Sequence, residues 1–303
     1  MLRYFCRIFA VLLALSPFCV KAGTVALIVS ENGGPYGEFS TTLSNALSGT
    51  SWQVSATLRA DTIVQPIPKA DLVVTAGVSA LRQAVQNYGG TPILATLIPR
   101  QSYEKLIAET GAKGQGRISA IWLDQPASRQ ALFLRNLLPG QKRIGLLVSH
   151  ESALLAANYR QVFANFGLGI DIEDSDTEQS LLPALNTLLQ RSNVLLALPD
   201  STIYRRDNIK PILVTTYRLQ KPVVAFSQAF VTAGALAALY STPAQIARQA
   251  ADTIAANGAN LQPAGGPSQF AIAINYNVAQ ALSLNVPDEA SIRQAMLAAR
   301  ESR

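Results

Sequence analysis

Short apolar runs alternate along most of the chain with stretches in which apolar residues recur every three or four positions. Unbroken apolar runs of this length are typical of strands buried in a parallel sheet. Such runs predict strands at 24–29, 72–75, 93–97, 118–123, 144–148, 194–198, 223–226, 236–240 and 270–274. Trp52 is followed by alternating residues, which predicts one further packed strand.

The intervening stretches predict amphipathic helices that cover the sheets. Their apolar faces are Phe39, Leu43 and Leu47; Val78, Leu81 and Val85; Leu155, Tyr159, Val162 and Phe166; and Ile246, Ala250 and Ile254. Gly49, Gly89, Gly90, Gly167 and Gly258 stand where these helices should end, as expected when the residue past the last turn is left-handed. The segment 242–245, "TPAQ", predicts a helix start with a capping box and a proline in its first turn.

One order of segments occurs twice. "VALIVSENG" at 25–33 resembles "IGLLVSHES" at 144–152, "ADLVVTAGVSAL" resembles "SNVLLALPDSTI", and "TPILATLIP" resembles "KPVVAFSQA". The repeat predicts an α/β fold class with two doubly wound parallel-sheet lobes joined by crossovers. The expected boundaries are 23–122 with 240–268 for the first lobe, and 123–239 with 269–303 for the second. Trp122 and Asp124 are expected to line the hinge.

The first 22 residues have the pattern of a cleaved secretory signal, with Arg3 and Arg7 ahead of an apolar block and small residues near Ala22. The expected location is therefore the periplasm. Both cysteines of the chain lie in this segment, which leaves no disulfide framework in the mature protein. Removing its three basic residues leaves 22 basic and 19 acidic side chains. A net charge of +3 is too small to indicate nucleic-acid binding, so none is expected.

Polar residues gather where strands of a parallel sheet should end. Asp200, Ser201 and Thr202 follow one such strand, and Thr75, Gly77 and Ser79 occupy the equivalent place in the first half. The carboxyl-terminal edge of a parallel sheet is where ligands bind. These residues are therefore candidates for ligand contact. The alternative is that Asp200–Thr202 cap a helix beginning near Ile203 and that 75–79 form an ordinary strand-to-helix turn.

Further candidates lie at the same edges. Glu31 could pair with a ligand ammonium group, and Tyr36 could stack on a flat ligand. The remaining members of the predicted ligand-binding set are Asn32, Thr96, Ser149, Ser152 and Ser227. A solvated loop is the alternative for 31–36. We expect Asp200→Ala to weaken ligand binding and to leave thermal melting largely intact.

No pattern for catalysis is present, and no catalytic residue is assigned. His150 is the single histidine, its neighbours Ser149 and Ser152 form no nucleophile elbow, and a surface position is expected for it. Glu173, Asp174 and Asp176 are interpreted as an acidic loop that binds no metal. No dinucleotide fingerprint occurs, so no cofactor is expected. The sequence thus favours a binding protein over an enzyme.

The second half carries a resemblance to a known family. "LLALPDSTIY" at 195–204, "QKPVVAFSQAFVTAGALAALYSTPAQIARQAADTIAANG" at 220–258 and "FAIAINYNVAQALSLNVPDE" at 270–289 resemble the type I periplasmic substrate-binding proteins of ABC transporters, in the branch that includes tryptophan and tyrosine binders. The resemblance places Asp200, Ser201 and Thr202 on the polar cluster of the family, Ser149–Ser152 on the loop opening the first helix of the second lobe, and Thr75–Ser79 on the corresponding loop of the first.

The resemblance implies a monomer that captures a small polar or amphipathic ligand between two lobes. Amino-acid-like compounds belong to this class of ligand. An inner-membrane ABC permease would be its partner. One alternative is an exported ligand-sensing subunit with the same fold, and a more remote one is a two-lobed transferase.

Overall fold

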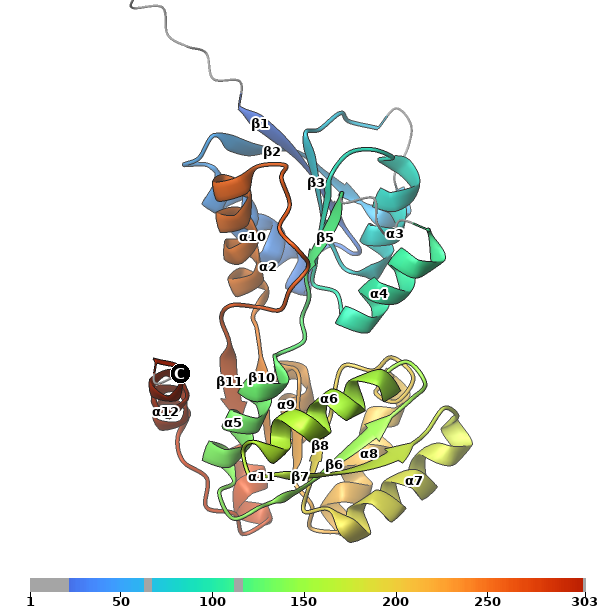
Figure 1. Cartoon of the computed structure of the whole chain (residues 1–303), viewed down its shortest axis with the longest axis vertical. Coiled ribbons are helices and arrows are strands. Elements are labelled where there is room, and N and C mark those ends of the chain that lie inside the picture. Colours follow the sequence, from blue (N-terminus) through green and yellow to red (C-terminus); the bar gives the residue numbers. More distant parts are fainter. Residues whose placement is uncertain (1–21, 63–66, 112–116, 302–303) are drawn as a thin grey trace, which may run out of the picture.

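The computed structural model describes residues 22–62, 67–111 and 117–301, and all statements below refer to these residues. The predicted secretory signal, apart from Ala22, lies outside them. Two sheets occupy the two ends of an elongated molecule, and the chain passes between them along one side (Figure 1). None of the helices in the described ranges combines the length and the apolar character needed to cross a membrane.

Lobe 1 is built on a five-stranded parallel sheet in the order β2-β1-β3-β4-β5. Helices α2 and α10 cover one face and α3 and α4 cover the other. Its strands are β1 (Gly23–Val29), β2 (Trp52–Arg59), β3 (Leu72–Ala76), β4 (Ile93–Thr96) and β5 (Ile118–Ile121), and its helices are α2 (Gly34–Leu47), the 3₁₀ turn η1 (Ala60–Thr62), α3 (Val78–Asn87), α4 (Arg100–Glu109) and α10 (Pro243–Asn257).

Lobe 2 is built on a six-stranded sheet in the order β11-β10-β9-β8-β6-β7. Its strands are β6 (Arg143–Val148), β7 (Gly169–Asp174), β8 (Val194–Leu196), β9 (Val223–Ala225), β10 (Ala237–Tyr240) and β11 (Ala271–Ile274). One face carries α5 (Ala127–Leu137), α6 (Ala153–Ala164), α11 (Tyr276–Ala281) and α12 (Glu289–Glu301), and the other carries α7 (Glu178–Arg191), α8 (Arg206–Arg218) and α9 (Gln228–Ala233).

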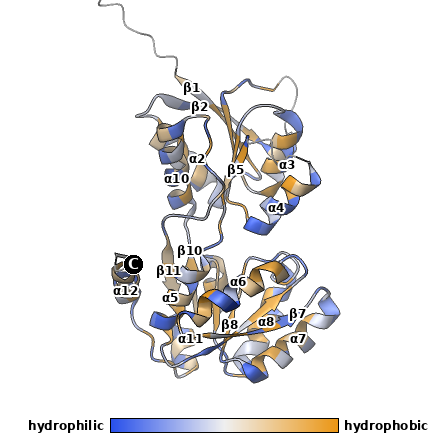
Figure 2. Ribbon diagram, viewed as in Figure 1, coloured by the Kyte–Doolittle hydropathy of each residue, from blue (hydrophilic) through white to orange (hydrophobic). Residues whose placement is uncertain are grey.

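Both faces of each sheet are buried, which explains the nearly unbroken apolar strands. In β1, Val25 and Leu27 face the α2/α10 side, while Ala26 and Ile28 face the α3/α4 side, and all four are fully buried. Hydrophobic residues follow the strands, and hydrophilic ones gather on outer helix surfaces and loops (Figure 2). The fold class predicted from the sequence is confirmed.

The predicted helical faces are largely buried. Phe39, Leu43 and Leu47 in α2 are fully buried, as are Ile246, Ala250 and Ile254 in α10. Val78 is the exception, since it lies in the first turn of α3 and is 37% exposed. Thr242 caps α10 as predicted: its Oγ1 accepts from Gln245 N, and Gln245 Oε1 accepts from Thr242 N. Gly90, Gly167 and Gly258 follow their helices at positive φ.

Three local predictions were wrong. Glu173 and Asp174 belong to the edge strand β7 and not to a loop; the alternating segment "GIDIED" is half-exposed and therefore lacks the apolar run of a central strand. Strand β11 pairs antiparallel with β10, where only parallel strands were expected. Helix α8 begins at Arg206, three residues later than the expected start near Ile203, because 201–203 form turns.

Candidate functional site

Three described segments connect the lobes and form a hinge. They are 122–126 between β5 and α5, 241–242 between β10 and α10, and 258–270 between α10 and β11 (Figure 1). Gln125 Nε2 donates to Ser241 Oγ over 2.8 Å, and Ser241 Oγ donates to Gln269 O over 2.6 Å. One buried serine hydroxyl therefore joins all three segments of the hinge.

The carboxyl-terminal edges of the two sheets face each other. Lys105 on α4 follows β4 in lobe 1, and Glu151 follows β6 in lobe 2. Lys105 Nζ donates to Glu151 Oε1 over 3.0 Å, an ion pair that crosses from one lobe to the other. Glu151 Oε2 also accepts a hydrogen bond from Ser201 Oγ over 2.9 Å. A residue of lobe 2 itself therefore orients the carboxylate that contacts Lys105.

On lobe 1, the loops after β1 and β3 pack closely together. Gly77 has φ +98, and a Cβ at this position would lie 2.4 Å from Ser30 Oγ and 3.0 Å from Tyr36 Cε1. Glycine is therefore required there both by the left-handed backbone and by the close approach of Tyr36. Partial burial, and then the nearby Glu31 carboxylate, raise the pKa of Tyr36.

The other predicted residues of lobe 1 divide into exposed and buried groups. Glu31, Asn32 and Ser79 are exposed at the edge. Thr75 and Thr96 are fully buried within their strands, and Thr96 Oγ1 donates to Thr75 O over 2.7 Å. Neither threonine side chain reaches solvent in this arrangement. The Thr75 hydroxyl has no partner among the described residues.

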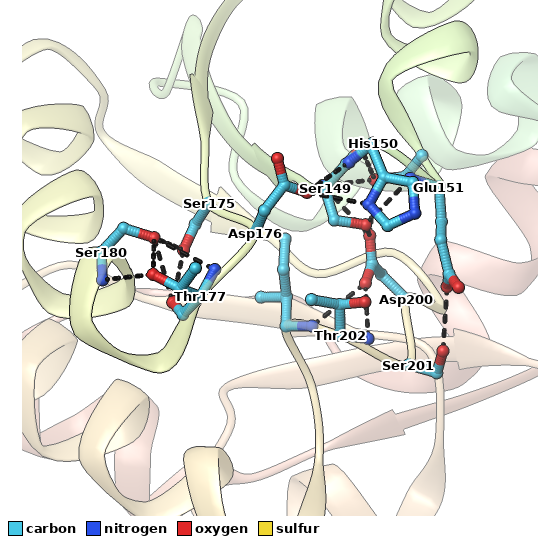
Figure 3. Close-up of polar contacts among 12 residues, drawn as sticks. Ser149, His150, Glu151, Ser175, Asp176, Thr177, Ser180, Asp200, Ser201 and Thr202 are labelled. Atoms are coloured by element: carbon cyan, nitrogen blue, oxygen red, sulfur yellow. Dashed lines mark hydrogen bonds and ion pairs between the residues drawn. The ribbon is translucent and has the colours of Figure 1, made fainter.

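On lobe 2, Asp200 is the centre of a buried hydrogen-bond network (Figure 3). Its Oδ2 accepts from Ser149 N, Ser149 Oγ and Ser152 Oγ at 3.2, 2.7 and 2.6 Å. Its Oδ1 accepts from the backbone N–H groups of Thr202 and Ile203 at 2.9 and 3.0 Å. Ser149, Ser152 and Asp200 were each predicted to contact a ligand, and in the structure they contact one another. Their polar atoms are directed inward, however, and Asp200 is only 4% exposed.

Three other predicted residues lie closer to the surface of the same edge. Ser201 is exposed and contacts Glu151, while Thr202 is half-buried. Ser227 is half-buried and caps α9, since its Oγ accepts from Phe230 N over 3.3 Å. Ser227 thus has a structural role at the start of that helix, and its position after β9 still places it on the carboxyl-terminal edge.

His150 lies on the carboxyl-terminal edge of lobe 2, with its side chain 71% exposed, and lines the cavity around the Lys105–Glu151 pair. His150 N and Nδ1 both contact Asp176 Oδ1, at 2.7 and 3.0 Å, and these hydrogen bonds hold the pKa of Asp176 below its usual range. The hydroxyls of Ser149 and Ser152 bond to Asp200 and not to the imidazole. Within the described ranges, no group of three or more His, Cys, Asp or Glu residues could hold a metal ion.

Two cavities open between the lobes. One, of about 330 Å³, lies beside the hinge and is lined by residues that include Arg100, Trp122, Asp124, Asn158 and Tyr159. The other, of about 310 Å³, lies around the Lys105–Glu151 pair. Arg100 stacks over the Trp122 ring at 5.1 Å, and its backbone N donates to Asp124 Oδ2 over 2.7 Å. Burial raises the pKa of Asp124 to about 6.

Trp122 and Asp124 were expected at the hinge, and both lie there. Arg100, Lys105, Glu151, Asn158 and Tyr159 were not identified from the sequence. Arg100 and Glu151 each follow the end of a predicted strand within a few residues. Their position at the carboxyl-terminal edge could therefore have identified them as candidates. Asn158 and Tyr159 lie inside a helix, where only the packing decides which side chain meets a cavity.

Comparison with known proteins supports the fold alone. A conserved domain protein from Vibrio cholerae is similar in structure, with a TM-score of 0.63 and 18% identity over 91% of this chain and 98% of that one. A ligand-free, open substrate-binding protein with adhesive properties from Clostridium difficile gives 0.63 and 14% over 88% and 96%. An ABC domain from Streptococcus pneumoniae in complex with L-Trp gives 0.61 and 15% over 89% and 98%.

No protein-family model matches the sequence, and no curated protein matches it. The structural neighbours include type I periplasmic binding proteins and also LacI-family regulators, and at this level of identity they show a shared two-lobed fold.

Proposed function

We propose that this protein is the periplasmic solute-binding component of an ABC transporter. In this proposal it captures a small polar or amphipathic ligand between lobe 1 and lobe 2 and acts as a monomer that delivers the ligand to an inner-membrane permease, without catalysis. The observation that carries the proposal is the facing pair of carboxyl-terminal sheet edges, which are spanned by the Lys105–Glu151 pair and joined by a three-segment hinge. The moving units would be the lobes predicted at 23–122 with 240–268 and 123–239 with 269–303.

The side chains fit a ligand that is partly polar and partly flat. Tyr36 supplies an aromatic ring beside the exposed Glu31 and Asn32, and the hinge cavity adds Trp122 and the carboxyl group of Asp124. Ser79, Ser201, Thr202 and Ser227 offer hydroxyl groups at the two edges. A ligand that bonds to both edges binds the closed arrangement better than the open one, and this difference in affinity shifts the lobes towards closure.

In this proposal, Asp200, Ser149 and Ser152 position the binding loops and do not contact the ligand. All the hydrogen bonds that the Asp200 carboxylate accepts in this network come from groups of lobe 2. Thr75 and Thr96 likewise act through the backbone of β3 and β4, since both side chains are buried.

The test is a thermal-shift screen against amino acids, nucleosides, sugars and small organic acids. A ligand that binds the folded state at 100 times its Kd should stabilise it by about 2.7 kcal/mol and raise Tm by several degrees. The same ligand should reduce the radius of gyration in small-angle X-ray scattering.

Tyr36→Ala should remove most of the shift. Tyr217→Ala, which removes an exposed tyrosine from α8 on the outside of lobe 2, is the matched control and should retain it. A ligand whose shift is unaffected by Tyr36→Ala, and whose binding leaves the scattering unchanged, would place the site elsewhere.

A further inference from the structure

A groove lined mainly by apolar side chains runs along α8 of lobe 2. Helix α8 is labelled in Figure 1. The groove has a volume of about 690 Å³ and lies between α8, the end of α9 and Val278 of α11. Leu213 forms its floor, and Val214 and Tyr217, which are 47% and 49% exposed, form its wall. None of its lining residues lines either cavity between the lobes.

The face of α8 that packs on the sheet does not account for the exposed Val214 and Tyr217. Asn208, Ile212, Leu213 and Thr216 are the buried positions of α8, and Leu213 both packs on the core of lobe 2 and lines the groove. The outward face of such a helix is normally polar. Here it holds an exposed valine and tyrosine beside the small residues Ala233 and Gly234, which leave the groove open.

Three cations lie along the same groove. Arg206, Lys210 and Arg218 stand at multiples of four residues, which is one ridge of a helix, and all three are exposed. None of them forms an ion pair with another described residue. Asp207 is the single acid on α8, α9 and α11, and it does not line the groove.

The spacing of the cations selects the size of the occupant. Twelve residues of helix separate Arg206 from Arg218, a rise of about 18 Å. A small metabolite cannot reach both ends, whereas three turns of a second helix can. A flat membrane surface would touch Val214 and Tyr217 but would not reach the floor at Leu213. A second copy of this chain fits poorly, because no described helix has more than two acidic residues.

We propose that this groove binds an amphipathic helix of another protein, one that presents apolar residues to Leu213 and Tyr217 and acidic residues at four-residue spacing to Arg206, Lys210 and Arg218. Burial of the apolar face supplies the affinity, and the three ion pairs set the register and the direction of the bound helix. This interaction is independent of ligand capture between the lobes.

The probe is a synthetic helical peptide of about five turns with leucine along one face and glutamate at every fourth position beside it. We expect saturable binding by calorimetry that weakens as salt rises. The triple variant Arg206→Gln, Lys210→Gln, Arg218→Gln should weaken binding about tenfold, as expected for three exposed ion pairs. Ala233→Trp should abolish it, because the indole fills the groove from an exposed position.

The control triple variant Lys142→Gln, Arg160→Gln, Arg248→Gln removes the same charge from exposed positions elsewhere and should bind as the wild type does. Circular dichroism and Tm verify that each variant is folded. The proposal is overturned if the wild type does not bind the peptide, if a peptide with glutamine for glutamate binds equally well, or if the control triple variant loses as much affinity. Stronger binding to vesicles of anionic lipid, lost in the same groove variants, would overturn it in favour of a membrane surface.

Discussion

Asp124 has the most strongly shifted pKa among the carboxyl groups near the hinge. It lies in segment 122–126, accepts a hydrogen bond from Arg100 N and lines the hinge cavity with Trp122 and Tyr159. Burial raises its pKa from 3.8 to about 6, and the hydrogen bond from Arg100 N offsets only part of this effect. The carboxyl group is therefore protonated in the folded protein at pH values at which it is ionised in the unfolded chain.

The sign of the resulting pH dependence follows from linkage. Below about pH 4 both states hold the proton, and Asp124 makes no difference to the free energy of unfolding. Between about pH 4 and pH 6 the folded state binds more protons, so stability falls as pH rises, and above this window the cost is constant. Asp124→Asn stays neutral and keeps an acceptor for Arg100 N. We expect the Tm of the wild type, relative to this variant, to fall between pH 4 and 6.5 and then to level off.

Thermal melts in a buffer series measure the difference. Asp252→Asn, which removes an exposed carboxylate from α10, corrects for the change in net charge. Two melting curves that stay parallel from pH 4 to pH 8 for the wild type and Asp124→Asn would show that the carboxyl group is not buried as described.

At the scale of elements, Asp200 holds the β6–α6 connection against the segment that leads from β8 to α8. The serines of one loop and the backbone N–H groups of the other all donate to a single carboxylate (Figure 3). Neither helix has a side-chain cap of its own at its first turn. Asp200 thus ties Ser152, the residue before α6, to the turns at Thr202 and Ile203 that precede α8.

The expectation that Asp200→Ala leaves melting intact is revised on this basis. The substitution removes the carboxylate acceptor of the Ser149 and Ser152 hydroxyls and of the Thr202 and Ile203 N–H groups, and hydrogen bonds to a buried charged group are the costly ones to lose. We expect a loss of about 3 kcal/mol in the free energy of unfolding, measured by urea denaturation. Ser201→Ala, at an exposed neighbouring position, should stay within about 0.5 kcal/mol of the wild type. A stable Asp200→Ala protein that had lost only ligand affinity would restore direct ligand contact by Asp200.

At the scale of the whole molecule, the Lys105–Glu151 pair is a polar contact that crosses the gap between the lobes away from the hinge. Lys105 is exposed, whereas Glu151 is oriented by Ser201 and is 17% exposed. A contact of this kind biases the two lobes towards the arrangement in which the residues meet, and salt should weaken it.

Removing the pair should therefore change the separation of the lobes. We expect Lys105→Gln or Glu151→Gln to broaden the distance distribution between spin labels placed at Asn45→Cys in lobe 1 and Gln179→Cys in lobe 2. High salt should broaden it in the otherwise unmodified labelled protein and have little further effect in the variants. Arg143→Gln, which breaks an ion pair with Asp171 inside lobe 2, is the control. An unchanged distribution in all variants would show that the pair does not restrain the lobes.

Much of this architecture could be predicted from the sequence because each repeated unit has its own local signature. The buried strands appear as apolar runs, the α2 and α10 faces as three- and four-residue spacings, and the start of α10 as a capping box at Thr242. The edge strand β7 was missed because it lacks this signature. Asp171 and Glu173 are tolerated at a half-exposed edge, and they interrupt the apolar run that would indicate a buried strand.

The sequence alone determined that this chain forms two α/β lobes, with polar residues where the strands end, because burial on both sheet faces imposes a pattern along the chain. Only the tertiary structure decided which of those polar residues are available to a ligand. Asp200 is enclosed by the loops it holds, while Lys105 and Glu151, 46 residues apart in the sequence, meet across the gap. Such pairings depend on how elements pack in three dimensions, and no local spacing in the sequence records them.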